Sequence, residues 1–509
     1  MTKKKFFMQG LILTAIAFFL RVTNIIYRSY LSQKIGAEGI GLYQLIISIF
    51  LLAVTLSTSG ISLAVTRMVT AAIVSGRRNQ IRSIVSKCFA FCLTISLSIA
   101  ALLFFASDFS ARVFLGNAKA ASSLRILGLG LPFMSICTCL RGYFLAVDES
   151  VSTGISDMLE NILTIGVTFF IFWKFAPQGI EKACAAAVIA STAGEMTSFT
   201  AAWISYRRSL KKNTPTENEK SQGVLHGLTH IALPCTLSSA ARSLLNTAEN
   251  LLIPKELQKF GQSYSSAMSQ YGMLQGMTMP MLYFPSSFLT SFASLLIPRI
   301  TKEREQNHKK SVEYITGKAI TAALQFGIFF AAIFIMFGDD WSHVFYHNDF
   351  AGEYLKVLAP IVPLMYLDVV VDCLLKGMDE QFNSMKFNLA DSSLRVLLVL
   401  ILLRFFGIES YVGILFFSTI FNASLSLGRL LKVTQVRLAP IKQVLLPVLI
   451  AMLSVMIAKI FTKPFSVEIT MLTIGIQLVL AGAIFVCLIK AVDLILEKIE
   501  QPEKESKTA

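Results

Sequence analysis

Two stretches, LPFMSICTCLRGYFLAVDES (131–150) and VPLMYLDVVVDCLLKGMDEQ (362–381), decide the fold because they are two copies of one pattern. Their residues align at a constant shift of 231, which places Pro132 on Pro363 and an Asp-Glu pair near the end of each stretch. The same shift continues outside them and aligns Asp108 with Asp339, Phe114 with Phe345, Leu124 with Leu355 and Glu160 with Asp391. A long internal repeat of apolar segments predicts a duplicated membrane protein with its site between two lobes.

The composition is that of a membrane protein. Of the 509 residues, 54% are hydrophobic and 15% are charged, and the mean hydropathy is +0.64. Soluble domains carry about 25% charged residues, so a chain this apolar has too little polar surface to cover itself in water. The apolar runs are continuous, which excludes a β-barrel with its alternating strands of ~10 residues.

We predict an all-α integral membrane protein of about fourteen transmembrane helices, since each span needs about 20 apolar residues. The expected spans are 6–31, 40–66, 84–106, 121–146, 154–174, 181–206, 226–252, 270–298, 314–337, 354–378, 385–405, 409–431, 441–461 and 469–495. The repeat groups the first twelve into two six-helix lobes of the same topology, related by an axis along the membrane normal. The expected divisions are an N-terminal lobe (1–206), a flexible cytoplasmic linker (207–225), a C-terminal lobe (226–431), two additional helices (432–495) and a charged, disordered cytoplasmic tail (496–509).

Lysine and arginine gather in every second connection between these spans, which the positive-inside rule makes the cytoplasmic ones. They include Arg77, Arg78, Arg82, Lys211, Lys212, Lys302, Lys309, Lys310, Lys432 and Lys442. We therefore expect a plasma-membrane protein with both termini in the cytoplasm. The net charge of +15 reflects this bias and not a nucleic-acid-binding surface. The first span follows three lysines without a small-residue cleavage site, so we expect a retained helix and not a signal peptide.

Charged residues inside the spans are the main candidates for substrate binding. Arg21 and Arg28 lie seven residues apart and share one face of the first helix. Its repeat partner, the seventh helix, carries Arg242, Asn246 and Glu249. A charge at the bilayer centre costs about 2.5–3.5 kcal/mol on insertion scales, so such groups face a cavity or a partner. The guanidinium fork binds phosphate or carboxylate oxygens in pairs. The alternatives are structural, namely an ion pair between Arg28 and Glu249 or a side chain that extends to the interface.

Acidic and amide side chains within the spans are candidates for coupling transport to Na⁺ or H⁺. The subset that we expect to bind such a cation is Glu249, Asn388 and Asp391, because hard cations prefer oxygen ligands. Structural ion pairs are again the alternative. Asp391 precedes Arg395 by four residues, which is the spacing of an ion pair on one helical face.

No pattern indicates a cofactor, a resident metal or an enzyme active site. The eight cysteines form no CxxC motif and no disulfide framework. Two histidine pairs have i, i+4 spacing but no third ligand nearby. The loops are short, and a Walker motif is absent from the sequence. These features favour a transporter driven by membrane potential or an ion gradient over an enzyme.

Several segments resemble flippases of the multidrug/oligosaccharidyl-lipid/polysaccharide (MOP) exporter superfamily. They are FFLRVTNIIYRSYLSQKIGAEGIGLYQL (18–45), SGISLAVTRMV (59–69) and the two copies at 131–150 and 362–381. Over about residues 1–495, the chain is most similar to the stage V sporulation protein B group, whose relatives include MurJ-like flippases.

The resemblance implies two six-helix lobes in a V that work by alternating access. It implies transport of an undecaprenyl-pyrophosphate-linked peptidoglycan precursor of the lipid II type, for spore cortex or cell wall, with peptidoglycan-synthesis enzymes as possible partners. MurJ-like proteins use arginines of helices 1, 2 and 8, and helices 13 and 14 form a groove for the lipid tail. Here the first helix matches through Arg21 and Arg28, but Arg67 and Arg299 lie only at helix ends and Arg242 lies in the seventh helix. Because of this departure, the resemblance does not identify the headgroup of the transported lipid.

Two other substrates stay open on the sequence alone. One is a cationic drug, carried by a cation-coupled multidrug exporter of the same superfamily. Such exporters usually have twelve helices and an acidic cavity, so the intramembrane arginines and the two additional helices disfavour this alternative. The other is a lipid-linked intermediate of a capsule or teichoic polysaccharide.

Overall fold

The computed structural model describes residues 3–213, 223–436, 439–462 and 470–506, and every regular element in these ranges is a helix. Ten stretches of the described residues are long and apolar enough to cross a membrane. The predicted all-α membrane fold is confirmed. Two of these stretches each contain a sharp break, at Gly36 (φ 67°) and at Gly407 (φ 66°), where the left-handed backbone favours glycine. The count of fourteen spans stays a prediction.

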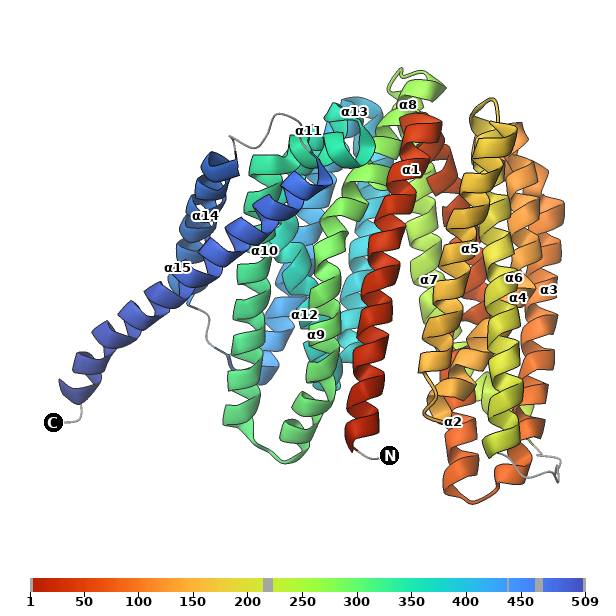
Figure 1. Ribbon diagram of the computed structural model, residues 1–509, viewed down its shortest axis with the longest axis horizontal. Coiled ribbons are helices and arrows are strands. Elements are labelled where there is room, and N and C mark those ends of the chain that lie inside the picture. The colour runs from red at the N-terminus through yellow and green to blue at the C-terminus, as the bar shows by residue number, and fades with distance from the viewer. Residues whose placement is uncertain (1–2, 214–222, 437–438, 463–469, 507–509) are drawn as a thin grey trace. The chain divides into compact units, whose positions relative to one another are not determined.

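The chain forms two compact units, Met1–Gly272 and Met273–Ala509. The helices of unit 1 are α1 (Lys3–Thr58), α2 (Ile61–Val74), α3 (Ile81–Val113), α4 (Ala121–Ala146), α5 (Val151–Phe175), α6 (Ile180–Asn213), α7 (Val224–Lys259) and α8 (Tyr264–Tyr271), with short 3₁₀ turns η1 (Arg78–Gln80) and η2 (Ala118–Ala120) (Figure 1). Within this unit α5 packs along α6, α3 packs along α4, and α7 contacts both α1 and α2. Its core includes fully buried Tyr143 and Leu140 of α4.

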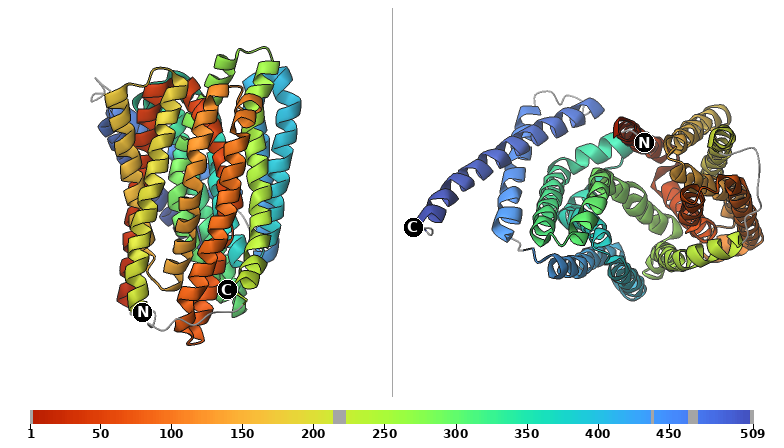
Figure 2. Two further views of the ribbon diagram at one scale, coloured as in Figure 1. Left: turned by 90° about the vertical axis from the view of Figure 1, so that its right-hand side faces the viewer. Right: turned by 90° about the horizontal axis from the view of Figure 1, so that it is seen from below.

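Unit 2 begins within a π-helical segment and ends in two long helices. Its elements are η3 (Gly272–Thr278), α9 (Met279–Glu305), α10 (Lys309–Tyr346), α11 (Asp349–Leu358), η4 (Ala359–Ile361), α12 (Val362–Gly377), α13 (Gln381–Thr434), η5 (Ile441–Leu445), α14 (Leu446–Thr462) and α15 (Met471–Ser506). Helix α10 contacts α9, α12 and α14, and α14 packs against α15 on one side of this unit (Figure 2).

The predicted repeat has a counterpart in the local structure of the two copies. Asn117 caps η2 with φ −138° and ψ 102°, and Asn348, at the shift of 231, caps α11 with φ −141° and ψ 107°. The residue before each cap, Gly116 or His347, has a positive φ. Equivalent residues therefore turn the chain in the same way in both units.

Equivalent ion pairs and turns extend this match. Arg125 pairs with Asp108 at 2.5 Å in unit 1, and the equivalent residues Lys356 and Asp339 pair in unit 2. After the next helix, Asp148 and Asp379 both adopt a left-handed conformation, with φ of 59° and 62°. The duplication seen in the sequence thus preserves contacts as well as residue types.

The packing boundary differs from the boundary drawn with the repeat. Thr247 and Asn250 of α7 both donate hydrogen bonds to Ser48 of α1, at 3.2 and 3.1 Å. A side chain at Gly272 would come within 2.0 Å of the Ala37 carbonyl oxygen, so this end of the unit also packs tightly on α1. These contacts extend unit 1 to Gly272, beyond the predicted N-terminal lobe, and the lobe division itself stays a prediction.

The predictions for the linker and for the C-terminal tail can be compared with the described residues. The linker expected at 207–225 is helical up to Asn213, and residues 214–222 lie outside the described part. The sequence predicts a disordered tail at 496–509. Residues 496–506 instead continue α15. Its glutamates and lysines are good helix formers, so the helix extends beyond its apolar part.

Candidate functional site

The predicted arginines of unit 1 have no ion-pair partner among the described residues. Arg21 and Arg28 are half-buried on the first half of α1, and Arg242 is exposed on α7. The structure describes no ion pair between Arg28 and Glu249, the structural alternative for these charges. Three guanidinium groups in helices of an apolar protein therefore keep their hydrogen-bonding capacity for another group.

The first half of α1 is held against α5 by polar and aromatic contacts. Asn161 of α5 donates to the amide oxygen of Asn24 at 3.3 Å, and the rings of Tyr30 and Phe169 lie 3.9 Å apart. These contacts fix the rotation of the helix that carries Arg21. The two arginines on α1 are therefore presented from a packed element and not from a loop.

Helix α7 presents its three predicted site residues differently. Arg242 and Asn246 are exposed and lie four residues apart, on one helical face. Glu249 is buried with 4% exposure, near Tyr271 of α8. The carboxylate thus belongs to the packed interior of unit 1, whereas Arg242 and Asn246 lie on its surface.

A polar cluster lies between α12 and α13 in unit 2. The carboxylate of Asp372 accepts hydrogen bonds from the Ser384 hydroxyl at 2.6 Å and from the Asn388 amide at 3.3 Å. The Asn388 amide oxygen in turn accepts from Asn422, with Nδ2 and Oδ1 3.4 Å apart. Both the amide nitrogen and the amide oxygen of Asn388 therefore form hydrogen bonds within this cluster.

The second predicted ion-coupling residue of unit 2 lies in another polar group of α13. Asp391 accepts a hydrogen bond from Ser418 and lies 3.4 Å from Nε of Arg395. The amide of Asn422 donates to Oδ2 of Asp368 at 2.9 Å. The ion pair expected from the spacing of Asp391 and Arg395 is thus confirmed. Asn388 and Asp391 lie in two polar groups of α12 and α13, which we together call the unit 2 network.

The unit 2 network carries several charges. It contains the three carboxylates of Asp368, Asp372 and Asp391 and the guanidinium of Arg395. The Asn422 amide oxygen is buried and has no hydrogen-bond donor among the described residues. A bound proton or small monovalent cation would reduce the negative charge and, for a cation, occupy that oxygen. The described residues contain no group of three or more His, Cys, Asp or Glu that could hold a metal ion.

A second acidic group surrounds Arg141 in unit 1. Arg141 pairs with Asp157 at 2.6 Å, and Glu160 lies near both residues. Glu195 is buried close by, with 7% exposure. Each unit therefore holds three carboxylates and one arginine on neighbouring helices. These helices are α4, α5 and α6 in unit 1 and α12 and α13 in unit 2.

The structure groups the predicted residues only in part. Asn388 and Asp391 share the network of unit 2, whereas Glu249 belongs to unit 1 with Arg21, Arg28, Arg242 and Asn246. Sequence reasoning missed Ser418 and Asn422. Together with Ser426 they recur every four residues on one face of α13, which is the signal of a polar helical stripe facing a partner.

Comparison with known proteins places the chain in a family. Residues 7–303 match the family described as Polysaccharide biosynthesis protein, and residues 261–401 match the MatE family. Stage V sporulation protein B of Bacillus subtilis (strain 168) is 27% identical over 408 residues, which cover 79% of this chain and 78% of that protein. Lipid II flippase MurJ of the same strain is 22% identical over 398 residues, covering 73% and 72%.

Solved structures with this fold include a lipid II flippase and a multidrug resistance MATE family transporter of the MOP superfamily. The inward closed conformation of lipid II flippase MurJ aligns with a TM-score of 0.71 and 14% identity, covering 95% of this chain and all of that one. An inward-facing MATE multidrug resistance transporter aligns with a TM-score of 0.68 and 13% identity, covering 84% and 99%. Because the first family match spans more than half of this chain, the chain belongs to the polysaccharide biosynthesis protein family.

Proposed function

We propose that the protein is a flippase for a lipid-linked oligosaccharide. Its substrate would be an undecaprenyl-pyrophosphate-linked peptidoglycan precursor of the lipid II type, moved from the inner to the outer leaflet by alternating access. The protein would act in the plasma membrane, with both termini in the cytoplasm, and serve spore-cortex or cell-wall synthesis. Peptidoglycan-synthesis enzymes that use the exported precursor are its expected partners.

The observation that carries this proposal is the set of unpaired intramembrane arginines, Arg21, Arg28 and Arg242. A pyrophosphate with attached sugars cannot cross hydrocarbon unaided, since its polar groups would lose their hydration. Guanidinium groups replace that hydration with charge-assisted, bidentate hydrogen bonds to phosphate oxygens. Asn246, on the exposed face of Arg242, supplies a neutral donor and acceptor suited to sugar hydroxyls.

The extent of the structural likeness supports a MurJ-like transporter. The MurJ structure covers 95% of this chain, which leaves about 25 residues unmatched. Helices α14 and α15 contain 17 and 36 residues, so the likeness extends into the two additional helices. The MATE structure covers 84%.

We further propose that Na⁺ or H⁺ drives the cycle through the acidic residues. Asn388 and Asp391 would bind the cation in the network of unit 2, and Glu249 would respond in unit 1. The support is the oxygen-rich character of this network and the buried Asn422 amide oxygen, which has no hydrogen-bond donor among the described residues. Cation binding would relieve the cost of buried negative charge and so favour one state of the transporter.

A second candidate function is cation-coupled drug export. The match of residues 261–401 to the MatE family favours it, as does the acidic character of the network in unit 2. The arginines of unit 1 oppose it, since they would repel a cationic drug. A capsule or teichoic lipid intermediate is the remaining alternative, because it presents the same pyrophosphate and differs only in its glycan.

Complementation tests these candidates directly. The chain is expressed in cells depleted of their lipid II flippase, and the amount of lipid II at the outer face is measured. Restored growth together with restored exposure supports lipid II transport. Stable membrane expression without either result contradicts it, and resistance to cationic drugs in those cells would then favour the exporter.

A further inference from the structure

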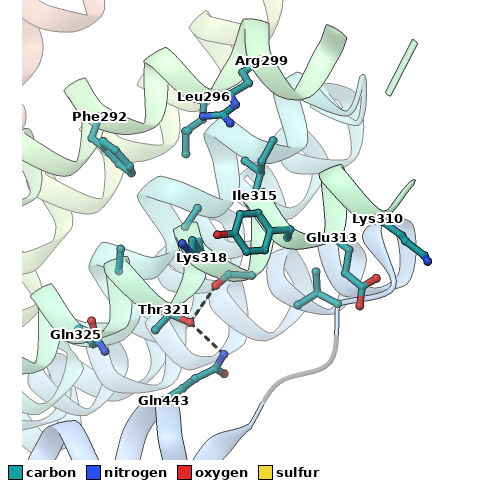
Figure 3. A pocket seen from close by; sticks show the side chains of 15 residues that line it. Phe292, Leu296, Arg299, Lys310, Glu313, Ile315, Lys318, Thr321, Gln325 and Gln443 are labelled. Carbon is teal, nitrogen blue, oxygen red and sulfur yellow. Dashed lines mark hydrogen bonds between the residues drawn. The ribbon is translucent and has the colours of Figure 1, made fainter. Parts of the chain in front are cut away.

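A large groove lies within unit 2, between α9, α10 and the start of α14. Its volume is about 920 Å³, at the upper end of the ~300–1,000 Å³ typical of small-molecule sites. Gln443 of η5 closes its floor by donating to the Thr321 hydroxyl at 3.1 Å, and that hydroxyl donates to the Gly317 carbonyl (Figure 3). The groove belongs to neither of the polar networks described above.

Three cations surround this groove. Arg299 comes from α9, and Lys310 and Lys318 come from α10 (Figure 3). All three are exposed, and none has a carboxylate within ion-pair distance among the described residues. The ammonium of Lys318 lies 4.6 Å from the centre of the Tyr314 ring, which positions it at the groove. Glu313 is the one carboxylate in the lining, so the rim carries a net positive charge.

Part of the groove lining is apolar and continues onto an apolar surface. Phe292, Leu296, Ala319, Ala322 and Val436 line it. The neighbouring outer surface of η5 and α14 is apolar too, with Ile441, Leu445 and Leu449 exposed by 74%, 60% and 61%. In a membrane protein such surface faces lipid chains. The groove therefore offers cations at one part and hydrocarbon contact at another.

We propose that this groove binds an anionic phospholipid, with the phosphate at Arg299 and Lys318, an acyl chain along the apolar lining, and Lys310 adding positive charge farther along α10. Basic pockets between transmembrane helices on the cytoplasmic side attract anionic headgroups. The three cations flank the connection between α9 and α10, which the positive-inside pattern assigns to the cytoplasm. A zwitterionic lipid would bind less well, because its own cationic group would be repelled by the lysine and arginine side chains. The bound lipid would fasten the start of α14 to α9 and α10.

This inference does not depend on the transported substrate. The lipid would be a bound component of the membrane and not cargo, and the groove residues differ from every residue proposed above for substrate or ion coupling. Loss of the lipid site and loss of the flippase function are therefore separate outcomes.

Native mass spectrometry of the purified full-length protein tests the proposal. Phosphatidylglycerol and phosphatidylcholine are titrated against the wild type, and we expect at least tenfold preference for phosphatidylglycerol. The variant R299Q/K310Q/K318Q should lose that preference. The matched variant K376Q/K386Q/K432Q, which removes three exposed lysines of α12 and α13 outside the groove, should keep it.

A second variant separates charge from shape. Ala322→Trp fills the apolar part without changing a charge and should reduce phosphatidylglycerol binding severalfold, which keeps the test decisive if the triple variant does not fold. Equal binding of both lipids by the wild type, or retained preference in both groove variants, would overturn the proposal. So would displacement of the lipid by equimolar inorganic phosphate, which would show a simple anion site. Stronger binding of undecaprenyl phosphate than of phosphatidylglycerol would assign the groove to substrate instead.

Discussion

Arg141 of α4 forms an ion pair of 2.6 Å with Asp157 of α5. The residues 231 positions later, Asp372 and Asn388, make the equivalent contact between α12 and α13, with the Asn388 amide 3.3 Å from the Asp372 carboxylate. The contact was preserved after duplication while the residue on the first helix changed from a cation to an anion. Each unit therefore holds its helix pair together at the same place with opposite charge on the first helix.

A double-mutant cycle on Arg141 and Asp157 should reveal this contact. Arg141→Gln leaves a half-buried carboxylate without its guanidinium, so the melting temperature of the purified protein should fall. In R141Q/D157N the carboxylate is also neutralised, and the loss should be smaller than the sum of the two single losses. Contacting charged residues show coupling of roughly 0.5–3 kcal/mol. Strict additivity would mean that the ion pair contributes nothing in the membrane.

Asp391→Asn should uncouple transport from the ion gradient. The substitution removes one negative charge from the unit 2 network and keeps the shape of the side chain. Coupling free energies of about 1–3 kcal/mol correspond to roughly 5–150-fold effects, so stimulation by an imposed Na⁺ or H⁺ gradient should drop by at least fivefold. The measurement is initial transport rate with and without the gradient.

The repeat supplies the control for this experiment. Glu160 occupies the position equivalent to Asp391 in unit 1, and Glu160→Gln removes the same charge there. Gradient stimulation should survive in this variant. If Glu160→Gln uncouples transport and Asp391→Asn does not, the coupling site lies in unit 1.

The turn before α13 should give a pH-dependent contribution to stability. Arg429 donates two hydrogen bonds to Glu380, at 2.7 and 3.0 Å, and these bonds together with that from Asn383 hold the pKa of the Glu380 carboxyl below its ordinary value. A depressed carboxyl pKa stabilises the folded state above the unfolded value of about 4.3. That stabilisation is lost as the pH falls through the lower folded pKa.

Glu380→Gln should therefore lower the melting temperature at pH 7, and the difference from wild type should shrink as the pH falls below about 4. Glu409→Gln, at the break within α13, serves as a control because no ion pair of Glu409 is described. A difference that stays constant from pH 7 to pH 3 would contradict the assigned role of the carboxylate.

Close helix packing at Gly272 should make this position intolerant of a side chain. A Cβ there would approach the Ala37 carbonyl oxygen to 2.0 Å and the Gly41 nitrogen to 2.7 Å, both of them backbone atoms that cannot rotate away. Overpacking of this kind costs about 1–3 kcal/mol, so Gly272→Ala should lower thermal stability. Gly413→Ala on α13, where nothing lies within 4 Å of the added atom, should not.

The sequence was sufficient for the features that repeat. Loop residues such as Asn348 and Asp379 recur at a fixed spacing because each must cap a helix or adopt a left-handed turn. The ion pair of Asp391 and Arg395 followed from helical geometry alone, since both residues lie on one helix.

Contacts between distant helices left no comparable signal. The hydrogen bonds of Thr247 and Asn250 to Ser48 join residues about 200 positions apart, and no local pattern specifies such a partner. For this reason α7 was expected in the second lobe, although it packs with α1. The stripe containing Ser418 and Asn422 could have been recognised as polar, but its partners Asp391 and Asp368 could only be identified in three dimensions.

The proposed function requires the arginines of unit 1 to carry a pyrophosphate-linked lipid across the membrane. The most direct measurement is the transfer of fluorescent lipid II between leaflets of proteoliposomes, compared for wild type, R21Q, R242Q and the exposed control R112Q. A charged hydrogen bond contributes about 1.5–3 kcal/mol, so R21Q and R242Q should each slow transfer roughly 10–100-fold, while R112Q transfers at the wild-type rate. Wild-type transfer by both R21Q and R242Q, in protein that is equally well folded, would contradict the account.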